Sequence, residues 1–261
     1  MSERTSYPNG VPSWVDLASP DVDGSVAFYS GLFGWDYAPA GPPEETGGYG
    51  MFSLRGKLVA GVGPLQNPTQ PPVWSTYVAV DDADVTAAKA TDAGGQVAMA
   101  PMDVMDAGRM AFLVDPVGAF VGVWQAARHP GAQLVNEPGA LGWNELVCRE
   151  PKKAIAFYES VFGWEPSAVE MGGHDYTVLN LDGKAIGALM KMTDQWPEGT
   201  PSHWMTYFVV ADADSSALRA QELGGNVMVG PIEAAGAGRI ATISDPNETM
   251  FSIIALSGTP D

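Results

Sequence analysis

Two side chains in the second half of the sequence, Glu145 and His203, could work together as an acid and a base. Side chains alternate between the two faces of a strand, so residues two apart share a face. Glu145 therefore shares a face with Trp143, and His203 shares one with Met205 and Tyr207. If both faces line one cavity, a carboxylate and an imidazole meet beside an indole. Such a pair can transfer protons, each group favouring the charged form of the other, or it can supply two of three ligands to a metal ion.

The first half offers the same kind of acid without an imidazole. Trp14 and Asp16 share one face of a predicted strand, and Ser75 and Tyr77 share a face of a later strand. An alternative role for Asp16 and Glu145 is to accept hydrogen bonds from backbone or indole N–H groups and so to hold a barrel together. Because both halves carry the acid and only one carries the histidine, we favour structure or ligand binding over catalysis.

Two arginines could recognise an anionic ligand. Arg109 and Arg239 each follow a glycine and begin a predicted strand. At the rim of a cavity, a guanidinium could bind a carboxylate or phosphate through paired hydrogen bonds. The favoured alternative is an ion pair with one of the chain's numerous acids, in the first half Asp103 or Asp106.

Seven of the eight tryptophans divide into two groups. Strand alternation directs Trp14, Trp143 and Trp124 toward the predicted cavities, where they are candidate ligand contacts. Four others recur at helix ends or strand starts in both halves and are expected to fill the core. These four are Trp35, Trp164, Trp74 and Trp204.

The elements that carry these residues occur twice. The segment from Trp14 to Trp35 (WVDLASPDVDGSVAFYSGLFGW) matches the segment from Trp143 to Trp164 (WNELVCREPKKAIAFYESVFGW) at a constant offset (143 − 14 = 129). The pairs Gly-Arg at 108 and 238 and Asp-Pro at 115 and 245 repeat later in the chain. A period of this length indicates a duplicated domain, because solenoid repeats are about 20–50 residues long.

Each half is expected to contain two β-α-β-β-β modules. In the first module, Asp21 caps a helix that ends at Gly34, because glycine adopts the left-handed conformation of a helix end. The second module has a helix over 82–93. Strands are predicted at 49–54, 57–62, 74–80, 96–100, 109–114 and 119–125, and in the second half at 142–148 and 203–210, with helices at 150–162 and 212–223.

We therefore predict two domains, over residues 8–126 and 141–257, each long enough to bury its own core. A linker over 127–140 joins them, and its His129 is expected to be exposed to solvent.

The repeated motifs resemble those of a known family. Asp21-x6-Phe28-Tyr29-x3-Phe33-Gly34-Trp35, the Asp81-Asp82 pair and Asp115-Pro116-x-Gly118 are similar to motifs of the glyoxalase/bleomycin-resistance/extradiol-dioxygenase (vicinal oxygen chelate) superfamily. The paired FYxxxFGW segments look like tandem actinobacterial members, some of them named hydroxylases or antigens. The resemblance implies an α+β fold of four βαβββ modules in two tandem glyoxalase-like domains. It also implies partial-barrel sheets with ligands on the side opposite the helices.

The resemblance further implies where a divalent metal would bind, and those positions lack suitable donors. The family takes metal ligands, usually His, Gln or Glu, from the first and last strands of each module. Donors of nitrogen or oxygen are what such an ion needs. In this sequence the positions hold Trp14, Ser75 and Gly122 in the first half and Trp143, Met205 and Ser252 in the second, and the strands over 59–62 and 186–189 contain no carboxylate. We therefore predict no cofactor, with a divalent metal ion as the alternative.

The composition limits the classes of partner that this protein is expected to bind. The net charge of −18, from 31 acidic and 13 basic residues, disfavours nucleic acid and anionic membranes as partners. No apolar run approaches the roughly 18 residues of a membrane helix, and no signal peptide is evident. The single cysteine, Cys148, cannot form an internal disulfide, which favours the cytoplasm. A monomer or a homodimer is expected, since the tandem copies could satisfy the family's pairing within one chain.

Three functions are compatible with these residues. The favoured one is a protein that binds a small organic ligand in aromatic-lined cavities. The alternative is an enzyme, a glyoxalase-like lyase or a dioxygenase or hydroxylase, with Glu145 and His203 as catalytic residues in an unusual metal or acid–base site. An antigenic or signalling surface with vestigial cavities is the third.

Overall fold

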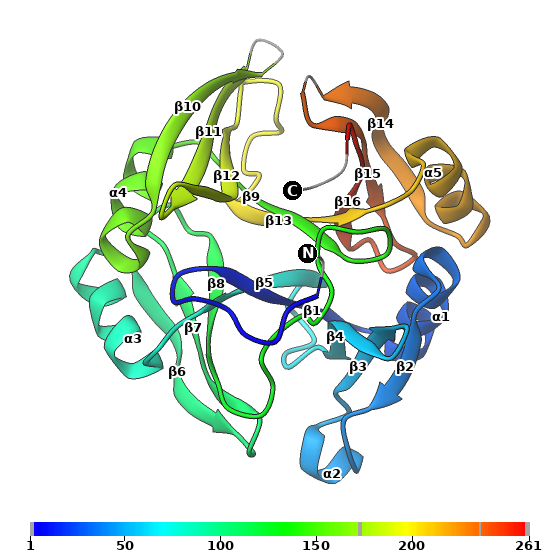
Figure 1. The fold of residues 1–261 in the computed structure, drawn as a ribbon, viewed down its shortest axis with the longest axis horizontal. Coiled ribbons are helices and arrows are strands. Elements are labelled where there is room, and N and C mark those ends of the chain that lie inside the picture. Colours follow the sequence, from blue (N-terminus) through cyan, green and yellow to red (C-terminus); the bar gives the residue numbers. More distant parts are fainter. Residues whose placement is uncertain (1–2, 172–173, 235, 259–261) are drawn as a thin grey trace.

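The protein folds into two eight-stranded sheets, one from each half of the chain (Figure 1). This computed structural model describes residues 3–171, 174–234 and 236–258. The strand order is β2-β3-β4-β1-β5-β8-β7-β6 in the first sheet and β10-β11-β12-β9-β13-β16-β15-β14 in the second. Each sheet therefore joins two modules side by side through their first strands, which run antiparallel. The fold is α+β and consists of four βαβββ modules, two in each half, as predicted.

The elements of the two halves follow one another in the same order. The first half contains β1 (Pro12–Ser19), α1 (Val22–Phe33), β2 (Asp36–Pro39), α2 (Pro43–Thr46), β3 (Gly50–Leu54), β4 (Lys57–Pro64), β5 (Val73–Ala79), α3 (Ala83–Asp92), β6 (Gln96–Val104), β7 (Gly108–Val114) and β8 (Phe120–Ala126). The second half contains β9 (Leu141–Cys148), α4 (Pro151–Phe162), β10 (Glu165–Met171), β11 (His174–Leu181), β12 (Lys184–Lys191), β13 (His203–Val209), α5 (Ala213–Glu222), β14 (Asn226–Ala234), β15 (Gly238–Ser244) and β16 (Met250–Leu256).

Local signals place the helices where the sequence predicts them. The Asp21 carboxylate accepts a hydrogen bond from the Gly24 N–H at 3.0 Å, which satisfies a free amide at the start of α1. Gly34 ends the helix with a φ of 72°. The short strand β2 and the one-turn helix α2 lie between Gly34 and residue 49, where no helix or strand is predicted from the sequence.

The hydrophobic cores are shared between the halves rather than confined to each. One cluster joins Phe28 and Trp35 of the first half to Phe208 and Phe251 of the second. The other joins the alanine face of α3 to α4, with Trp164 and Trp204. The expectation of one core per half is therefore wrong, because each sheet buries its helix-bearing face against the other half. The tryptophans predicted to fill the core, Trp35, Trp74, Trp164 and Trp204, are at most 5% exposed.

Two matching hydrogen-bonded joints cross between the halves. The Tyr29 hydroxyl of α1 donates to the Asp245 carboxylate at 3.1 Å, and the Tyr158 hydroxyl of α4 donates to the Asp115 carboxylate at 2.9 Å. Each tyrosine also accepts a hydrogen bond from an indole N–H, that of Trp74 or Trp204. The repeated FYxxxFGW and Asp-Pro motifs therefore join the two halves.

The N-terminal arm, residues 3–11, and the linker, residues 127–140, occupy equivalent places. Trp35 donates its indole N–H to the Gly139 carbonyl, and Trp164 donates to the Gly10 carbonyl, both at 2.7 Å. Gly139 follows Gly10 by 129 residues, the offset of the sequence repeat (139 − 10 = 129). Each half is thus completed by an extended segment, and the two segments differ in sequence. None of the helices in the described part of the chain has the length and apolar character of a membrane span.

Candidate functional site

A buried carboxylate with two phenol neighbours lies at the centre of the second sheet. The Glu145 carboxylate of β9 accepts a hydrogen bond from the Tyr207 hydroxyl at 3.1 Å and another from Tyr176. The Tyr176 hydroxyl in turn accepts the indole N–H of Trp143 at 3.2 Å. Strand register places Met205 directly opposite Glu145. These five residues share the face of the sheet opposite the helices, which we call the inner face.

The first sheet has the same arrangement at the equivalent place. The Asp16 carboxylate accepts hydrogen bonds from the Tyr77 and Tyr49 hydroxyls, at 3.0 and 3.3 Å. The Tyr49 hydroxyl accepts the indole N–H of Trp14 at 3.1 Å. Ser75 lies opposite Asp16 across the β1–β5 pair. Each half therefore carries a chain of hydrogen bonds running from indole to phenol to carboxylate.

The tyrosine hydroxyls in both chains of hydrogen bonds keep their protons and act as donors. Burial, and then the negative charge of Asp16, raise the pKa of Tyr49 and Tyr77 well above the ordinary value. Burial and the charge of Glu145 do the same to the pKa of Tyr207. Burial also raises the pKa of Asp16 to about 6, although the hydrogen bonds from Tyr77 and Tyr49 act in the opposite direction.

Burial likewise raises the pKa of the Glu145 carboxyl, and the hydrogen bonds from Tyr176 and Tyr207 partly offset the rise. Glu145 is 4% exposed, so its charge is shielded from solvent. A carboxyl held in this way can accept hydrogen bonds from a ligand or exchange a proton with it.

Tyr49 and Tyr176 are missed in the sequence analysis, although each links the indole to the carboxylate in one of the two chains of hydrogen bonds. Tyr49 precedes β3, and Tyr176 lies within β11. They are 127 residues apart (176 − 49 = 127), whereas the tryptophans they contact are 129 apart (143 − 14 = 129). A search for tyrosines near, rather than at, the repeat offset would have found them.

The inner face of the first sheet is closed by a histidine from the linker. The His129 ring packs edge-on against Trp14, with ring centroids 4.4 Å apart, and against Trp124 at 5.5 Å. Trp124 donates its indole N–H to the His129 carbonyl at 2.8 Å. His129 is 9% exposed, so the prediction of an exposed linker histidine is wrong. Neither ring nitrogen of His129 has a hydrogen-bond partner among the described residues.

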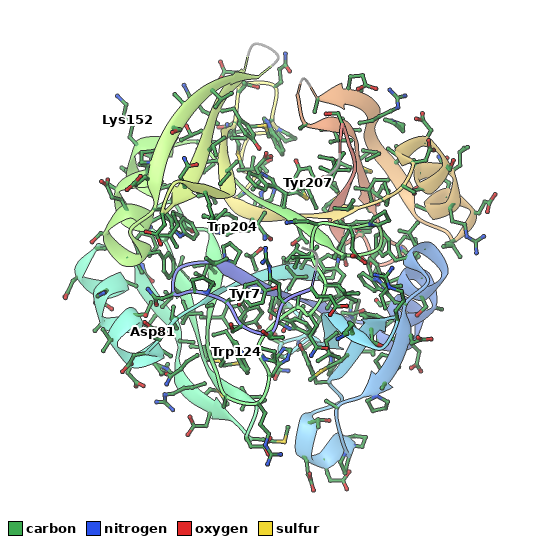
Figure 2. The ribbon with its side chains drawn as sticks, viewed as in Figure 1. Tyr7, Asp81, Trp124, Lys152, Trp204 and Tyr207 are labelled. Carbon is green, nitrogen blue, oxygen red and sulfur yellow. The ribbon has the colours of Figure 1, made fainter. Side chains whose placement is uncertain are left out.

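The corresponding aromatic side chains of the second sheet remain partly open to solvent. Trp14 and Tyr77 are 4% and 5% exposed, whereas Trp143 and Tyr207 fall in the half-buried class. A methionine-rich cluster adjoins them and continues the inner face toward His203. It contains Val147, Met190, Met192, Trp196, Met205 and Tyr207. Figure 2 marks Tyr207 on the second sheet and Trp124 on the first.

His203 does not bond to Glu145 in the structure. Its ring Nδ1 lies 2.9 Å from the Pro201 carbonyl oxygen, and its register partner on β9 is Val147. Burial lowers the pKa of His203, which favours the neutral ring. The proposed acid–base pair of Glu145 and His203 therefore has no direct contact to support it, and it stays a prediction.

The two arginines are engaged by acids on the surface. Arg109 forms paired hydrogen bonds with Asp84 at 2.7 and 3.0 Å and a third with Asp103 at 2.9 Å. Arg239 pairs with Asp214 at 2.5 and 2.9 Å and with Glu233 at 3.2 Å. The structure therefore shows the ion pairs that were the alternative to ligand binding, including the one with Asp103.

The donors present on the inner faces do not suit a divalent metal ion. At the last-strand positions, Gly122 lies beside Tyr77 and Ser252 beside Tyr207 in the parallel strand pairs. The Tyr77 ring occupies the space that a side chain at 122 would need. Among the described residues, the centre of each inner face holds one carboxylate, Asp16 or Glu145, whose neighbours are protonated phenols. In the described part of the chain, no three His, Cys, Asp or Glu side chains gather to hold an ion.

Comparison with known proteins identifies the family. The family model of the Glyoxalase/Bleomycin resistance protein/Dioxygenase superfamily matches residues 12–123 and again residues 140–253. The chain belongs to this superfamily. CFP32 of Mycobacterium tuberculosis (strain CDC 1551 / Oshkosh), which is named for a glyoxylase, is 43% identical over 97% of this chain and 98% of its own. The anthracycline biosynthesis protein DnrV of Streptomyces peucetius is 36% identical over 97% of this chain and 95% of its own.

Solved structures of the superfamily share the fold. The Mn(II)-bound glyoxalase from Novosphingobium aromaticivorans superposes with a TM-score of 0.63 at 16% identity, covering 100% of this chain and 87% of that one. The 2,2',3-trihydroxybiphenyl 1,2-dioxygenase from Sphingomonas wittichii strain RW1 gives 0.66 at 14% identity, with coverages of 95% and 91%. At these identities the likeness concerns the fold alone.

Proposed function

We propose that this protein binds a planar, hydrophobic organic molecule on the inner face of the second sheet, without a divalent metal ion. The observation that carries the proposal is the contrast between two equivalent sites. The first site is filled by its own tryptophans and by His129. The second keeps Trp143 and Tyr207 half-buried, whereas their counterparts Trp14 and Tyr77 are buried.

The side chains of the second site suit such a ligand. Aromatic rings and methionines offer a large, polarisable apolar surface that adapts to flat molecules. The Glu145 carboxylate and the Tyr207 hydroxyl, 3.1 Å apart, supply a small number of polar contacts that can orient the ligand's hydroxyl or carbonyl groups. A positively charged ligand would also gain from the chain's net charge of −18.

One relative supports this class of ligand. DnrV, which is 36% identical across almost the whole chain, is named for anthracycline biosynthesis. Anthracyclines are planar, hydroxylated polycyclic aromatics, and several carry an amino sugar. A flat aromatic of this kind fits a site with indole and phenol rings next to a carboxylate.

Binding of 1,4-dihydroxyanthraquinone, measured by tryptophan fluorescence quenching and by calorimetry, tests the proposal. We expect saturable binding with a Kd of about 1–100 μM. Trp143→Ala should weaken it at least about tenfold, because it removes the half-buried indole surface. Treatment with EDTA should leave the affinity unchanged.

A matched pair of variants assigns the site to one sheet. Tyr207→Phe removes a hydroxyl from the second site and should weaken binding, whereas Tyr77→Phe removes the equivalent hydroxyl from the first and should not. Absence of saturable binding, or equal losses in both variants, would contradict the proposal. Binding that disappears with EDTA and returns with Mn²⁺ would instead favour the enzyme alternative.

A further inference from the structure

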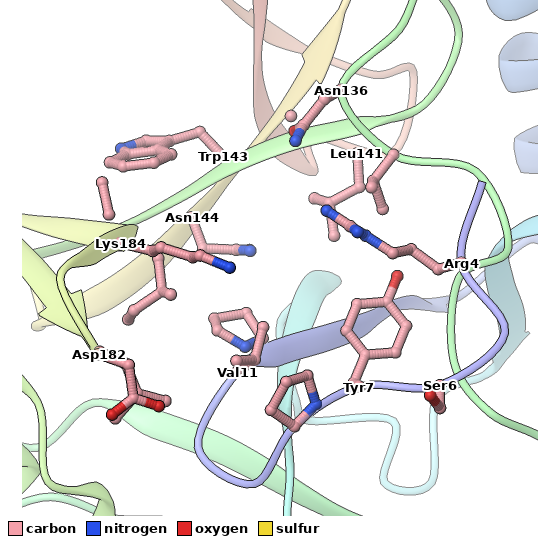
Figure 3. A pocket seen from close by; sticks show the side chains of 17 residues that line it. Arg4, Ser6, Tyr7, Val11, Asn136, Leu141, Trp143, Asn144, Asp182 and Lys184 are labelled. Carbon is pink, nitrogen blue, oxygen red and sulfur yellow. The ribbon is translucent and has the colours of Figure 1, made fainter. Parts of the chain in front are cut away.

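A second candidate site lies where the N-terminal arm meets the linker and the start of β12, and it adjoins the inner face of the second sheet at Trp143. The structure has a pocket of about 290 Å³ there. Tyr7 and Arg4 of the arm, Asn136 of the linker and Lys184 of β12 line it, together with Asn144 of β9 (Figure 3). Trp143 of β9 and proline and aliphatic side chains of the arm, the linker and strands β9, β11 and β12 form most of the rest of its wall.

The two cations of this pocket have no acidic partner. Neither Arg4 nor Lys184 forms an ion pair with any residue that the structure describes, although the chain has 31 acids for 13 bases. Asp182 also lines the pocket. In Figure 3 its carboxylate points away from the Lys184 ammonium group, which is directed into the pocket. The lining therefore carries two positive charges against one negative charge.

A buried amide adds a hydrogen-bond donor. Asn144 is 3% exposed, and its Oδ1 accepts a hydrogen bond from the Thr76 hydroxyl at 2.8 Å. This bond fixes the amide so that Nδ2 faces the pocket beside Lys184 (Figure 3). Nδ2 donates to no described residue, and it is open to the pocket rather than enclosed, so it is available to donate to a ligand. A ligand oxygen at this position would satisfy it.

At the equivalent place in the first half, the basic side chains are paired with acidic ones. There the turn between β3 and β4 carries Arg55 and Lys57, which pair with Glu137 and with Glu3, the latter at 3.3 Å. In the second half the turn carries Asp182 and Lys184. Lys184 is the counterpart of Lys57, and the linker residue equivalent to its partner Glu3 is Ala132 (3 + 129 = 132), which has no charge to offer Lys184.

The amide donor is also specific to the second half. The residue equivalent to Asn144 is Val15 (144 − 129 = 15), which is fully buried. An unpaired cation pair and an amide donor therefore occur together in one half and are both lacking in its copy. Lys89, Arg149 and Lys152 also form no ion pair with a described residue. Arg4 and Lys184 differ from these in lining one pocket together with the Asn144 amide, and this combination points to a ligand.

We infer that this pocket binds the carboxylate of a small organic acid. The carboxylate lies between Arg4 and Lys184 and accepts a hydrogen bond from the Asn144 amide. The apolar body of the acid contacts the proline and aliphatic wall. A single negative charge matches the lining's excess of one positive charge, which favours a carboxylate over a phosphate dianion.

Calorimetric titration of the full chain with benzoate, at constant ionic strength, tests the inference. We expect a Kd of about 1 mM or below. Benzamide, the uncharged analogue, and inorganic phosphate should both bind at least about fivefold more weakly. Lys184→Ala and Arg4→Ala should each weaken benzoate binding at least about fivefold. Both side chains are exposed, so the variants should fold normally.

Two control variants separate this pocket from the rest of the molecule. Lys57→Ala removes the equivalent lysine of the first half, which is paired, and should leave benzoate binding unchanged. Tyr207→Phe should also leave it unchanged, because that hydroxyl belongs to the inner face. Tighter binding of benzamide or phosphate than of benzoate would overturn the inference. So would equal affinities in wild type, Lys184→Ala and Arg4→Ala, or equal losses in Lys57→Ala and Lys184→Ala.

Discussion

The inner faces of the two sheets carry the same kind of hydrogen-bonded residues but differ in how far these residues are buried. Both carry an indole, two phenols and a carboxylate in one hydrogen-bonded chain. In the first, His129 of the linker covers Trp14 and Trp124 and completes a closed core. In the second, the corresponding aromatics border a methionine cluster and stay half-buried. One copy is thus a closed core, while the other leaves part of its aromatic surface open to solvent.

The largest expected difference between the faces is in the cost of deleting their indoles. Trp14→Ala should lower the free energy of unfolding by about 3–5 kcal/mol, because it opens a cavity in a closed core. Trp143→Ala should cost clearly less, since its ring is already half exposed. Urea denaturation followed by circular dichroism measures both. Equal losses would mean that the two faces are equally closed.

The two hydrogen-bonded joints between the halves should, in contrast, contribute equally to the free energy of unfolding. Tyr29→Phe and Tyr158→Phe each leave a buried carboxylate and an indole N–H short of one partner. Each should therefore cost about 1–3 kcal/mol of unfolding free energy. Chemical denaturation of the two variants compares them directly. A marked inequality would show that the halves diverge at their interface as well as on their inner faces.

Replacing the histidine that closes the first face should stabilise the protein. His129→Phe removes two buried ring nitrogens without partners and should gain about 1 kcal/mol at pH 7, since an orphaned buried polar group is costly. A gain of zero, or a loss, in thermal unfolding would mean that His129 has a partner, such as a buried water molecule.

The same histidine should make stability depend on pH. Burial lowers the pKa of His129 to about 4, so between about 6.5 and 4 the unfolded chain binds the proton and the folded chain does not. Its contribution to stability is therefore present above pH 6.5 and is lost as pH falls to 4. Asp16, with a pKa raised to about 6, acts in the opposite direction: its contribution is complete below about 3.8 and is lost as pH rises through 6. Unfolding curves of His129→Phe and Asp16→Asn from pH 4 to 7 should separate these opposite slopes.

The smallest expected effects concern the surface arginines. Arg109→Ala and Arg239→Ala remove equivalent, exposed ion pairs. Both should lower the melting temperature slightly and equally, and 0.5 M NaCl should remove most of the difference from wild type by screening. Neither should change ligand binding. A loss of binding in Arg239→Ala alone would place that guanidinium in the second site.

The sequence determines much of this fold because its signals are local and occur twice. The helix cap at Asp21, the left-handed Gly34 and the alternation around Asp16 give the first helix and the strand faces correctly. The short strand β2 is not predictable in this way, since its pairing with β3 lies within a Pro- and Gly-rich segment. The sharing of cores between the halves depends on packing across the chain and is not predictable from local pattern either.

The candidate site is predictable in part. Alternation places Trp143 and Glu145 on one face, as it does Met205 and Tyr207. Tyr176 reaches the site from another strand, and His129 reaches the first face from a linker. Both depend on how the connecting segments fold back, which periodicity does not encode.

The interleaved cores have a consequence for how the protein unfolds and how it arose. Because α1 is buried against the second sheet and α4 against the first, a chain cut at the linker would leave two fragments, each with a bare apolar face. The fragments should reassociate rather than persist apart. This geometry is that of a dimer whose two subunits have become one polypeptide, and a single gene for both subunits allows one ligand site to be closed while the other keeps its opening.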